Sequence, residues 1–337
     1  MNLVRLGIGI ALIGVTLSSP ALARDVKVGV PEQKDDFIES LFSSKYLKSA
    51  GINLLPSQFL KEDEILSATI GGAVDVGFFA LSAVDQIKLE QSPRLYTALT
   101  RAFFFKSGEE IFAVEDTAFG DAVLADLRRA KIFPLAFWNR GVSKIVAQMP
   151  ITSPRDFQRL KVGEAAEKTE KIMSSPILVS LGAEPKRLAK GYSVSAAITE
   201  GVVAATVLDP KTRYDASSWD DLTGIEGQLY LTDFQPIVGI LSASEGFWNS
   251  LSESEKQAWR LAVNEATQHS RHEIMTSERD IGRTAKVRLV APSDQNRLKL
   301  IGSMVNYKDG LKVKEDLLTV EQAKMLVQNG EDSKKKK

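Results

Sequence analysis

Two histidines and a glutamate close together in the sequence are the first residues to test for chemistry. His269, His272 and Glu273 have helical spacing, which could place two imidazoles and a carboxylate beside a metal ion. No further ligand can be named elsewhere in the chain, and the same residues suit the solvated side of a long helix. We therefore expect no metal site and no cofactor.

Serine and cysteine chemistry has equally little support. The chain has no cysteine, which excludes thiolate nucleophiles, disulfides and cysteine-ligated zinc. Ser82, Ser143 and Ser195 lie near glycine or aromatic residues, but none is in the G-x-S-x-G motif of a nucleophilic serine. The sequence therefore disfavours an enzyme.

Polar residues that follow two expected strands are candidates for ligand binding. Residues 139–144 follow an apolar strand over 133–137, and residues 209–213 follow another over 202–208. Open α/β sheets bind ligands beyond the carboxyl ends of their strands. Polar surface loops explain the same pattern equally well. The basic side chains of the two segments are Arg140, Lys144, Lys211 and Arg213.

Three consecutive phenylalanines at residues 103–105 could form the aromatic wall of a ligand cleft. A buried core strand is the favoured alternative for so short an apolar run.

Length and charge narrow the class of protein. A chain of 337 residues predicts about two domains. Lys and Arg together number 43, as do Asp and Glu, so the formal net charge is zero. General nucleic-acid binding depends on excess positive charge, so we expect no nucleic-acid partner.

The start of the chain predicts export. One basic residue precedes an uncharged apolar run over residues 6–17, and Ala21-Leu22-Ala23 has the small-x-small pattern of a cleavage site. The run is shorter than the ~20 residues of a membrane-spanning helix, so a cleaved signal peptide over residues 1–23 is favoured over a retained anchor. We expect the mature protein, from about residue 24, to be exported and soluble.

Two similar segments predict two related α/β units. The first has a helix over residues 66–70, Gly71-Gly72 and a strand over 73–79. The second has a helix over residues 194–198, Gly201 and a strand over 202–208. A further strand is expected over residues 25–30 and helices over 37–49 and 121–130, so helices and strands alternate.

A long helix is expected near the C-terminus. Ser252 and Glu255 form a capping box, and apolar or small residues follow at helical steps to about residue 282. They are Trp259, Val263, Ala266, Ser270 and Ile274. Residues 321–337, which end in four lysines, are expected to be a disordered basic tail.

Several segments, in order, resemble the periplasmic solute-binding subunit of tripartite ATP-independent (TRAP) transporters of the DctP type. The clearest is MPITSPRDFQRLKV at residues 149–162, which resembles the family's kPI-sP-DlkGlKiR segment. LGAEP at residues 181–185, AITEGVV at 197–203 and GAVDV at 72–76 also match, so the resemblance covers most of the mature chain.

The resemblance implies a two-lobed α/β clamp of the periplasmic-binding-protein type, with a long helix that bridges both lobes. One lobe is expected to comprise residues 24–140 plus 233–271, and the other residues 141–232 plus 272–320. Family members capture a small organic acid in the cleft between the lobes and present it to membrane permease subunits. An arginine of the second lobe usually pairs with the solute carboxylate.

This chain lacks the arginine that usually pairs with the solute carboxylate in the family that it resembles. Gly163, followed by Glu164, occupies its position, and Ser143 stands where some relatives have a second arginine. Because an unpaired buried carboxylate costs several kcal/mol, one of the four basic residues above must replace the arginine if an acid is bound. An interaction or sensory protein that has lost carboxylate capture is the alternative. The residues expected to bind the solute are Arg140, Ser143, Lys144, Gly163, Glu164, Leu208, Asp209, Lys211, Arg213 and Phe79.

Overall fold

The computed structural model describes residues 23–32, 35–89, 91, 93, 95–164, 174–189, 192–209, 222, 225, 227–283 and 287–305. The expected signal peptide, apart from Ala23, and the expected basic tail lie outside these residues. Lys211 and Arg213 also lie outside them.

Strands and helices alternate through most of the chain. The strands are β1 (Arg24–Pro31), β2 (Ile52–Phe59), β3 (Val76–Ala80), β4 (Phe133–Ala147), β5 (Lys161–Glu164), β6 (Glu184–Arg187), β7 (Ala205–Leu208), β8 (Leu229–Ala243) and β9 (Val287–Val290). The α-helices are α1 (Asp36–Ser43), α2 (Lys45–Ser49), α3 (Glu62–Ile70), α4 (Gly108–Glu115), α5 (Ala118–Arg129), α6 (Ser174–Ser180), α7 (Val194–Thr199), α9 (Glu245–Ser250), α10 (Glu253–Gly282) and α11 (Asp294–Val305). Short 3-10 helices are η1 (Leu81–Gln86), η2 (Leu95–Ala98) and η3 (Pro154–Phe157).

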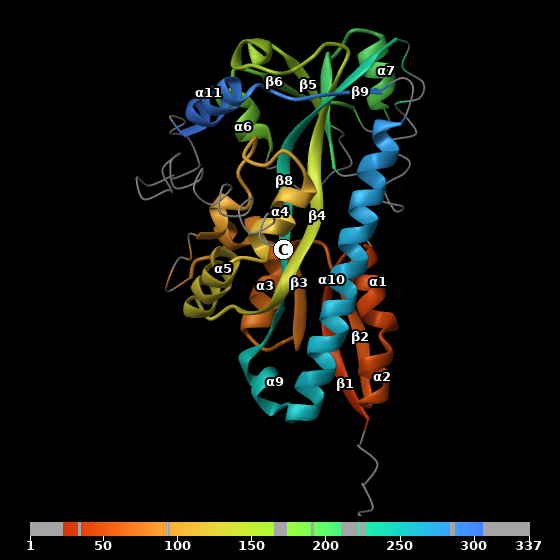
Figure 1. Ribbon diagram of the computed structural model, residues 1–337, viewed down its shortest axis with the longest axis vertical. Coiled ribbons are helices and arrows are strands. Elements are labelled where there is room, and N and C mark those ends of the chain that lie inside the picture. Colours follow the sequence, from red (N-terminus) through yellow and green to blue (C-terminus); the bar gives the residue numbers. More distant parts are fainter. Residues whose placement is uncertain are drawn as a thin grey trace, which may run out of the picture.

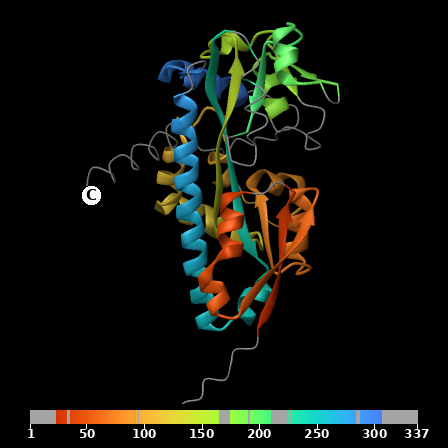
Figure 2. The ribbon, with the colours of Figure 1, turned by 90° about the vertical axis from the view of Figure 1, so that its right-hand side faces the viewer.

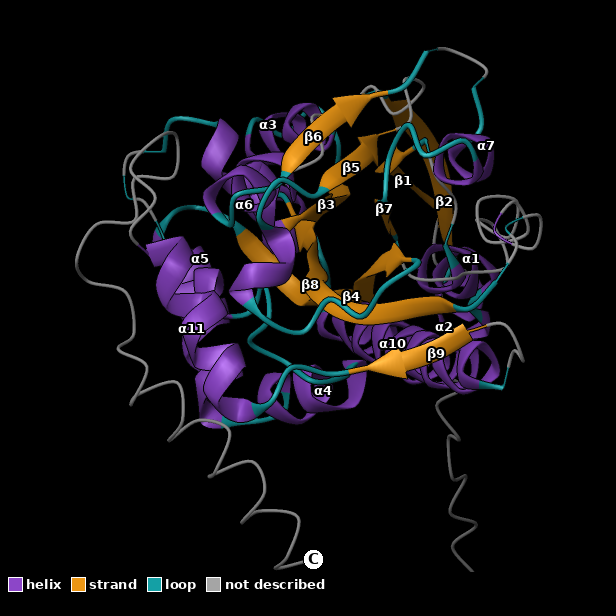
Figure 3. Ribbon diagram, turned by 90° about the horizontal axis from the view of Figure 1, so that it is seen from above, coloured by secondary structure: helices purple, strands orange, loops and turns teal. Residues whose placement is uncertain are grey.

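One mixed sheet organises the whole molecule. Its order is β2-β1-β3-β8-β4-β7-β5-β6, and β9 also pairs with β8. The antiparallel strands β4 and β8 run through both ends of the elongated molecule (Figure 1). We call the end that contains β1, β2 and β3 the first half, and the end that contains β5, β6, β7 and β9 the second half. From above, the sheet curls and the helices lie around its outside (Figure 3).

Each half contains the same three-stranded unit. In the first half β1 pairs in parallel with β2 and β3, and in the second half β5 pairs in parallel with β6 and β7. The carbonyls of Ala68 and Ala197 each accept two backbone hydrogen bonds at the helix end before the third strand. Gly72 and Gly201 follow with φ of 72° and 70°, a conformation that glycine adopts without a steric penalty. The predicted helix, glycine and strand units are confirmed, although both strands begin three residues later than predicted.

The long helix predicted after Ser252 is confirmed as α10. The Ser252 amide donates to Glu255 Oε2 at 2.8 Å, and the Glu255 amide donates to Ser252 Oγ at 3.3 Å, which completes the capping box. The stripe from Trp259 to Ile274 is buried against the rest of the protein. Figure 2 shows that α10 runs beside both halves on one side of the molecule.

Buried side chains fill both faces of the sheet in each half. In the first half, one core joins α1 and α10 to β1 and Trp138, and the other packs α3, α4 and α5 against Phe79. In the second half, Ile145 and Val146, neighbours on β4, point into two separate cores. This alternation is what a strand buried on both faces requires.

Two local predictions are partly wrong. The helix expected over residues 37–49 is divided at Ser44, whose ψ of 123° is extended, so α1 and α2 are separate. Residues 103–105 form a turn rather than a strand, with Phe103 at a φ of 59°. Phe103 and Phe105 are buried, so the core assignment is confirmed while the strand assignment is not.

Candidate functional site

The strands β4 and β8 pass from one half to the other through a short irregular stretch. Their pairing changes register between Asn139 and Lys144, and Gly141 has a φ of 95°. Such bulges bend a strand and increase its twist. We call residues 139–144 of β4 together with residues 233–239 of β8 the strand crossing.

The carboxyl ends of β3 and β7 reach the strand crossing from opposite halves. β3 is antiparallel to β8 and ends with Ala80 opposite Gly239. β7 is antiparallel to β4 and ends with Leu208 opposite Lys144. Because open α/β sheets bind ligands beyond such strand ends, the region around the crossing is the candidate site.

Arg140 has acidic neighbours on the first-half side of the crossing. Its Nη1 lies 3.7 Å from Glu62 Oε1, and its guanidinium lies 5.3 Å from the ring centroid of Trp138. The indole Nε1 of Trp138 donates to Asp35 Oδ2 at 3.0 Å. Burial raises the pKa of Asp35, while the positive charge of Arg140 acts to lower it. The charge of Arg140 is therefore largely balanced within the protein.

Lys144 is nearly inaccessible to water and also has acidic partners. Its Nζ contacts Asp233 of β8 and lies 3.7 Å from Glu278 Oε1 of α10. Burial raises the pKa of the Glu278 carboxyl, and the charge of Lys144 opposes that change. Lys144 therefore links β4, β8 and α10 before any solute is bound.

Arg140, Ser143 and Lys144 all lie within β4. The expectation of a loop over residues 139–144 is therefore wrong. The Ser143 hydroxyl donates to the Gln235 carbonyl at 3.0 Å and accepts from the Gln235 amide at 3.2 Å. β8 supplies a partner along most of β4, which lets the strand continue through the polar segment to Ala147.

Four other predicted site residues lie at or near strand ends. Phe79 of β3 is fully buried, and Leu208, at the matching position of β7, is also buried. Asp209 directly follows β7 and is partly exposed. The Gly163 carbonyl in β5 accepts from Thr206 Oγ1 at 3.0 Å. Phe79 and Leu208 thus present their backbones, rather than large exposed side chains, near the crossing.

Gly163 lies in a closely packed part of β5. A Cβ added there would lie 3.1 Å from Cγ2 of Val203. At the matching position of the first half, a Cβ on Gly29 would lie 3.4 Å from Cγ2 of Val74. In both units the loop after the helix therefore packs closely against this position of the central strand. Glu164 ends β5, and its side chain lies outside the described residues.

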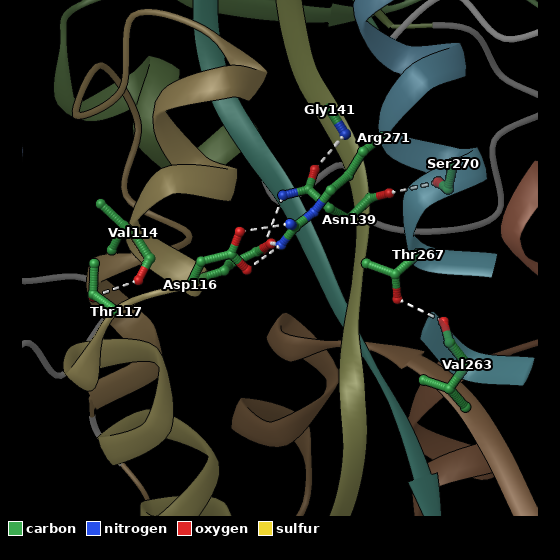
Figure 4. A network of polar contacts seen from close by, with 10 residues as sticks. Val114, Asp116, Thr117, Asn139, Gly141, Val263, Thr267, Ser270 and Arg271 are labelled. Carbon is green, nitrogen blue, oxygen red and sulfur yellow. Dashed lines mark hydrogen bonds and ion pairs between the residues drawn. The ribbon is translucent and has the colours of Figure 1, made fainter. Parts of the chain in front are cut away.

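A buried polar network that sequence reasoning missed joins α4 and α10 to the crossing (Figure 4). Arg271 of α10 donates from Nη2 to Glu115 Oε2 at 3.0 Å and from Nη1 to Asp116 Oδ2 at 2.8 Å. The Asn139 amide group donates to Glu115 Oε1 at 2.9 Å, and its Oδ1 accepts from the Gly141 amide at 2.8 Å.

The Glu115 carboxyl is the most perturbed acid of this network. Burial raises its pKa to about 7, because loss of water outweighs the attraction of Arg271. The network holds α10 against the crossing. One signal was available in the sequence, since Arg271 lies beside Ser270 of the predicted buried stripe, and an arginine at the edge of a core usually pairs with an acid.

Metal ligands are not assembled in the part of the chain that the structure describes. No group of three histidine, aspartate or glutamate side chains there could hold a metal ion. His269 and His272 are exposed on α10. Among the described helices, none is long and apolar enough to cross a membrane.

Comparison with known proteins identifies similar chains. Residues 52–297 match the DctP family model, described as bacterial extracellular solute-binding protein, family 7. The C4-dicarboxylate-binding periplasmic protein DctP of Rhodobacter capsulatus is 24% identical over 277 residues, which are 78% of either chain.

Two solved TRAP periplasmic solute-binding proteins have a similar fold. One, from Ochrobactrum anthropi, gives a TM-score of 0.70 at 18% identity and covers 93% of this chain and 97% of its own. The other, from Haemophilus influenzae with bound L-gulonate, gives a TM-score of 0.61 at 16% identity and covers 91% of this chain and 99% of its own. The expected two-lobed α/β architecture is confirmed.

Proposed function

The chain belongs to family 7 of the bacterial extracellular solute-binding proteins, and we propose that it captures a small organic acid between its two halves. It then delivers the acid to the membrane permease subunits of a TRAP-type transporter. Residues 1–23 are a signal peptide that is removed on export to the periplasm. The family is a class of binding proteins and not a class of enzymes.

The observation that carries this proposal is the convergence of the two repeated units on the strand crossing. The carboxyl end of one strand from each unit reaches it, at Ala80 and at Leu208. A solute at this place contacts both halves and therefore binds best when they are close together. Such differential affinity is what closes a clamp.

The two lobes of this clamp divide at the crossing. One comprises residues 24–140 plus 233–271, and the other comprises residues 141–232 plus 272–320. The register shifts in β4 and the φ of 95° at Gly141 support this division, because they mark where the strand pair bends most easily.

Two comparisons support an acid as the solute. The Rhodobacter capsulatus relative binds C4-dicarboxylates, and the Haemophilus influenzae protein holds L-gulonate, so each recognises a carboxylate. In this chain the polar and small residues around the strand ends line the proposed site, with Phe79 and Leu208 supporting it from the cores. The lining residues proposed are Arg140, Ser143, Lys144, Gly163, Glu164, Asp209, Lys211 and Arg213.

A thermal-shift assay tests the solute class. The mature chain is heated with succinate, with L-gulonate, with the neutral hexitol that corresponds to gulonate, and with a neutral amino acid. A ligand at 100 times its dissociation constant adds about 2.7 kcal/mol to the free energy of unfolding. We expect an acid to raise the melting temperature and the neutral compounds to leave it unchanged. A shift with neutral compounds alone contradicts the proposal, and no shift at all favours the interaction protein.

A further inference from the structure

The cations of the strand crossing are occupied by the protein's own acids. Arg140 lies near Glu62 and Asp35, and Lys144 lies between Asp233 and Glu278. Arg271 pairs with two acids of its own. A solute carboxylate would have to displace one of these acids, which leaves a charge without its partner in a poorly solvated place.

Arg101 differs from these cations. Its guanidinium is half-buried, and burial alone lowers its pKa, because no acid nearby opposes the loss of water. Within the described residues, its side chain makes no hydrogen bond or ion pair. Arg297 is also desolvated, but its Nη1 donates to the carbonyls of Phe103 at 3.1 Å and of Phe105 at 3.2 Å. Arg101 is thus a desolvated cation without compensation.

The backbone places Arg101 between the two halves. Two residues before it, Leu99 lies in a first-half core, and two residues after it, Phe103 lies in a second-half core. The Thr100 carbonyl accepts from Gln235 Nε2 at 3.1 Å, and the Phe103 amide donates to the Phe234 carbonyl at 2.6 Å. Arg101 is therefore held from both sides at the level of the strand crossing.

Gln235 connects this segment to Ser143 of the strand crossing. Its amide and carbonyl both bond the Ser143 hydroxyl, and its side chain bonds Thr100. Arg101 directly follows Thr100, so the same glutamine links the segment that contains Arg101 to Ser143 of β4.

We propose that Arg101 binds the carboxylate of the solute. A guanidinium offers two parallel N–H donors to a carboxylate, and a partly desolvated one gains most from that pairing. The proposal rests on the proposed function, because it names the residue that recognises the acid.

Isothermal titration calorimetry with succinate and L-gulonate tests the assignment on the mature chain. The variants are Arg101→Gln, Arg101→Lys and, as a control, Arg260→Gln, an arginine whose side chain is 55% exposed on α10. We expect Arg101→Gln to weaken binding of the acid at least ~30-fold. Arg101→Lys keeps the charge but not the fork, so it should lie between Arg101→Gln and the parent. The control should bind as the parent does.

The unliganded protein gives a second readout. Arg101→Met removes an uncompensated desolvated charge, so we expect its melting temperature to exceed that of the parent. A lower melting temperature overturns the proposal, because it shows that the guanidinium is structural.

The binding results separate two failures. If the parent binds an acid and Arg101→Gln binds it equally well, the Arg101 assignment is wrong and the proposed function stands. If the parent binds neither acid, the proposed function is wrong, and the Arg101 assignment is overturned with it.

Discussion

The two halves contain the same three-stranded unit, but the turn before its third strand makes different hydrogen bonds in each half. In the first half the Asp75 amide donates to the Lys27 carbonyl at 2.9 Å, and Asp75 Oδ2 accepts from the Lys27 amide at 2.8 Å. In the second half Ala204 makes only the backbone bond, to the Lys161 carbonyl at 2.9 Å. The backbone bond is therefore what the unit requires, and the side chain at this position is free to differ.

The buried side chains of the two units also differ at matched backbone positions. Phe79, the residue before the end of β3, packs in a first-half core, and Leu208 at the end of β7 packs in a second-half core. The two positions share backbone geometry but differ in side-chain volume. Substitutions at matched positions can therefore show which properties belong to the unit and which belong to one half.

The largest expected effect is loss of stability when these two core residues are truncated. Phe79→Ala should cost about 4 kcal/mol of the free energy of unfolding, and Leu208→Ala about 3 kcal/mol. The cost is greater for Phe79 because truncation of the larger side chain leaves the larger cavity. Urea denaturation measures both. If Leu208→Ala instead abolishes acid binding at nearly unchanged stability, its side chain contacts the solute and the comparison of the cores fails.

Removal of the buried cation on the second-half side should come next. Lys144→Met leaves Asp233 and Glu278 without their shared partner, which should cost about 3 kcal/mol at pH 8. The cost should be smaller at pH 5, since Glu278, whose pKa is already raised, can take up a proton. Denaturation at the two pH values measures the difference.

An exposed pair supplies the control for Lys144→Met. Arg283 lies 3.5 Å from Asp280, and its side chain is 78% exposed. Arg283→Met should therefore cost less than about 1 kcal/mol at either pH. Equal losses for the two variants would show that Lys144 contributes no more than a surface charge.

Local patterns predicted the repeated units and the long helix, because glycine positions, a capping box and helical spacing are short-range signals. The continuation of β4 through Arg140 to Lys144 was not predictable in this way. Those polar residues form a strand because β8, almost a hundred residues later, pairs with them. Tertiary pairing therefore outweighed local polarity.

The candidate site was less predictable than the fold. Sequence position identified the ends of β3 and β7, but not which cations already have acidic partners. Glu62, Asp233 and Glu278 lie far along the chain from the cations that they neutralise. Arg101 gave no signal in the sequence, since the absence of a partner for its side chain among the described residues is evident only in the folded chain.

The pH dependence of stability should reveal the network on the first-half side of α10. Glu115 has a pKa of about 7 in the folded protein against 4.5 ordinarily, so between these values the folded state holds a proton that the unfolded state releases. Its contribution to stability is complete below pH 4.5 and is lost as the pH rises through 7. The expected slope is on the order of 1 kcal/mol per pH unit.

Glu115→Gln should remove this slope, because glutamine does not titrate. Urea denaturation between pH 5 and pH 8 compares the parent, Glu115→Gln and the control Glu253→Gln, whose side chain is 79% exposed. The control should keep the slope of the parent. Identical slopes for all three proteins would show that Glu115 is ionised throughout this range.

Substitutions at Asp75 and Ala204, the matched positions of the two turns, should change stability least. Asp75→Ala should cost about 1 kcal/mol, the contribution of one net hydrogen bond. Ala204→Asp should add up to about 1 kcal/mol if its carboxylate reaches the Lys161 amide as Asp75 reaches Lys27. Thermal denaturation measures both. A loss of stability for Ala204→Asp would mean that the two turns are not equivalent.

The most direct test of the clamp is the distance between the two halves with and without solute. The chain has no cysteine, so Leu60→Cys in the first half and Leu289→Cys in the second, at exposed positions, accept spin labels at defined sites. Pulsed electron paramagnetic resonance then measures the distance between the labels. An acid that binds according to calorimetry should shift the distance distribution to shorter values. An unchanged distribution with the acid bound would contradict closure of the two halves around the solute.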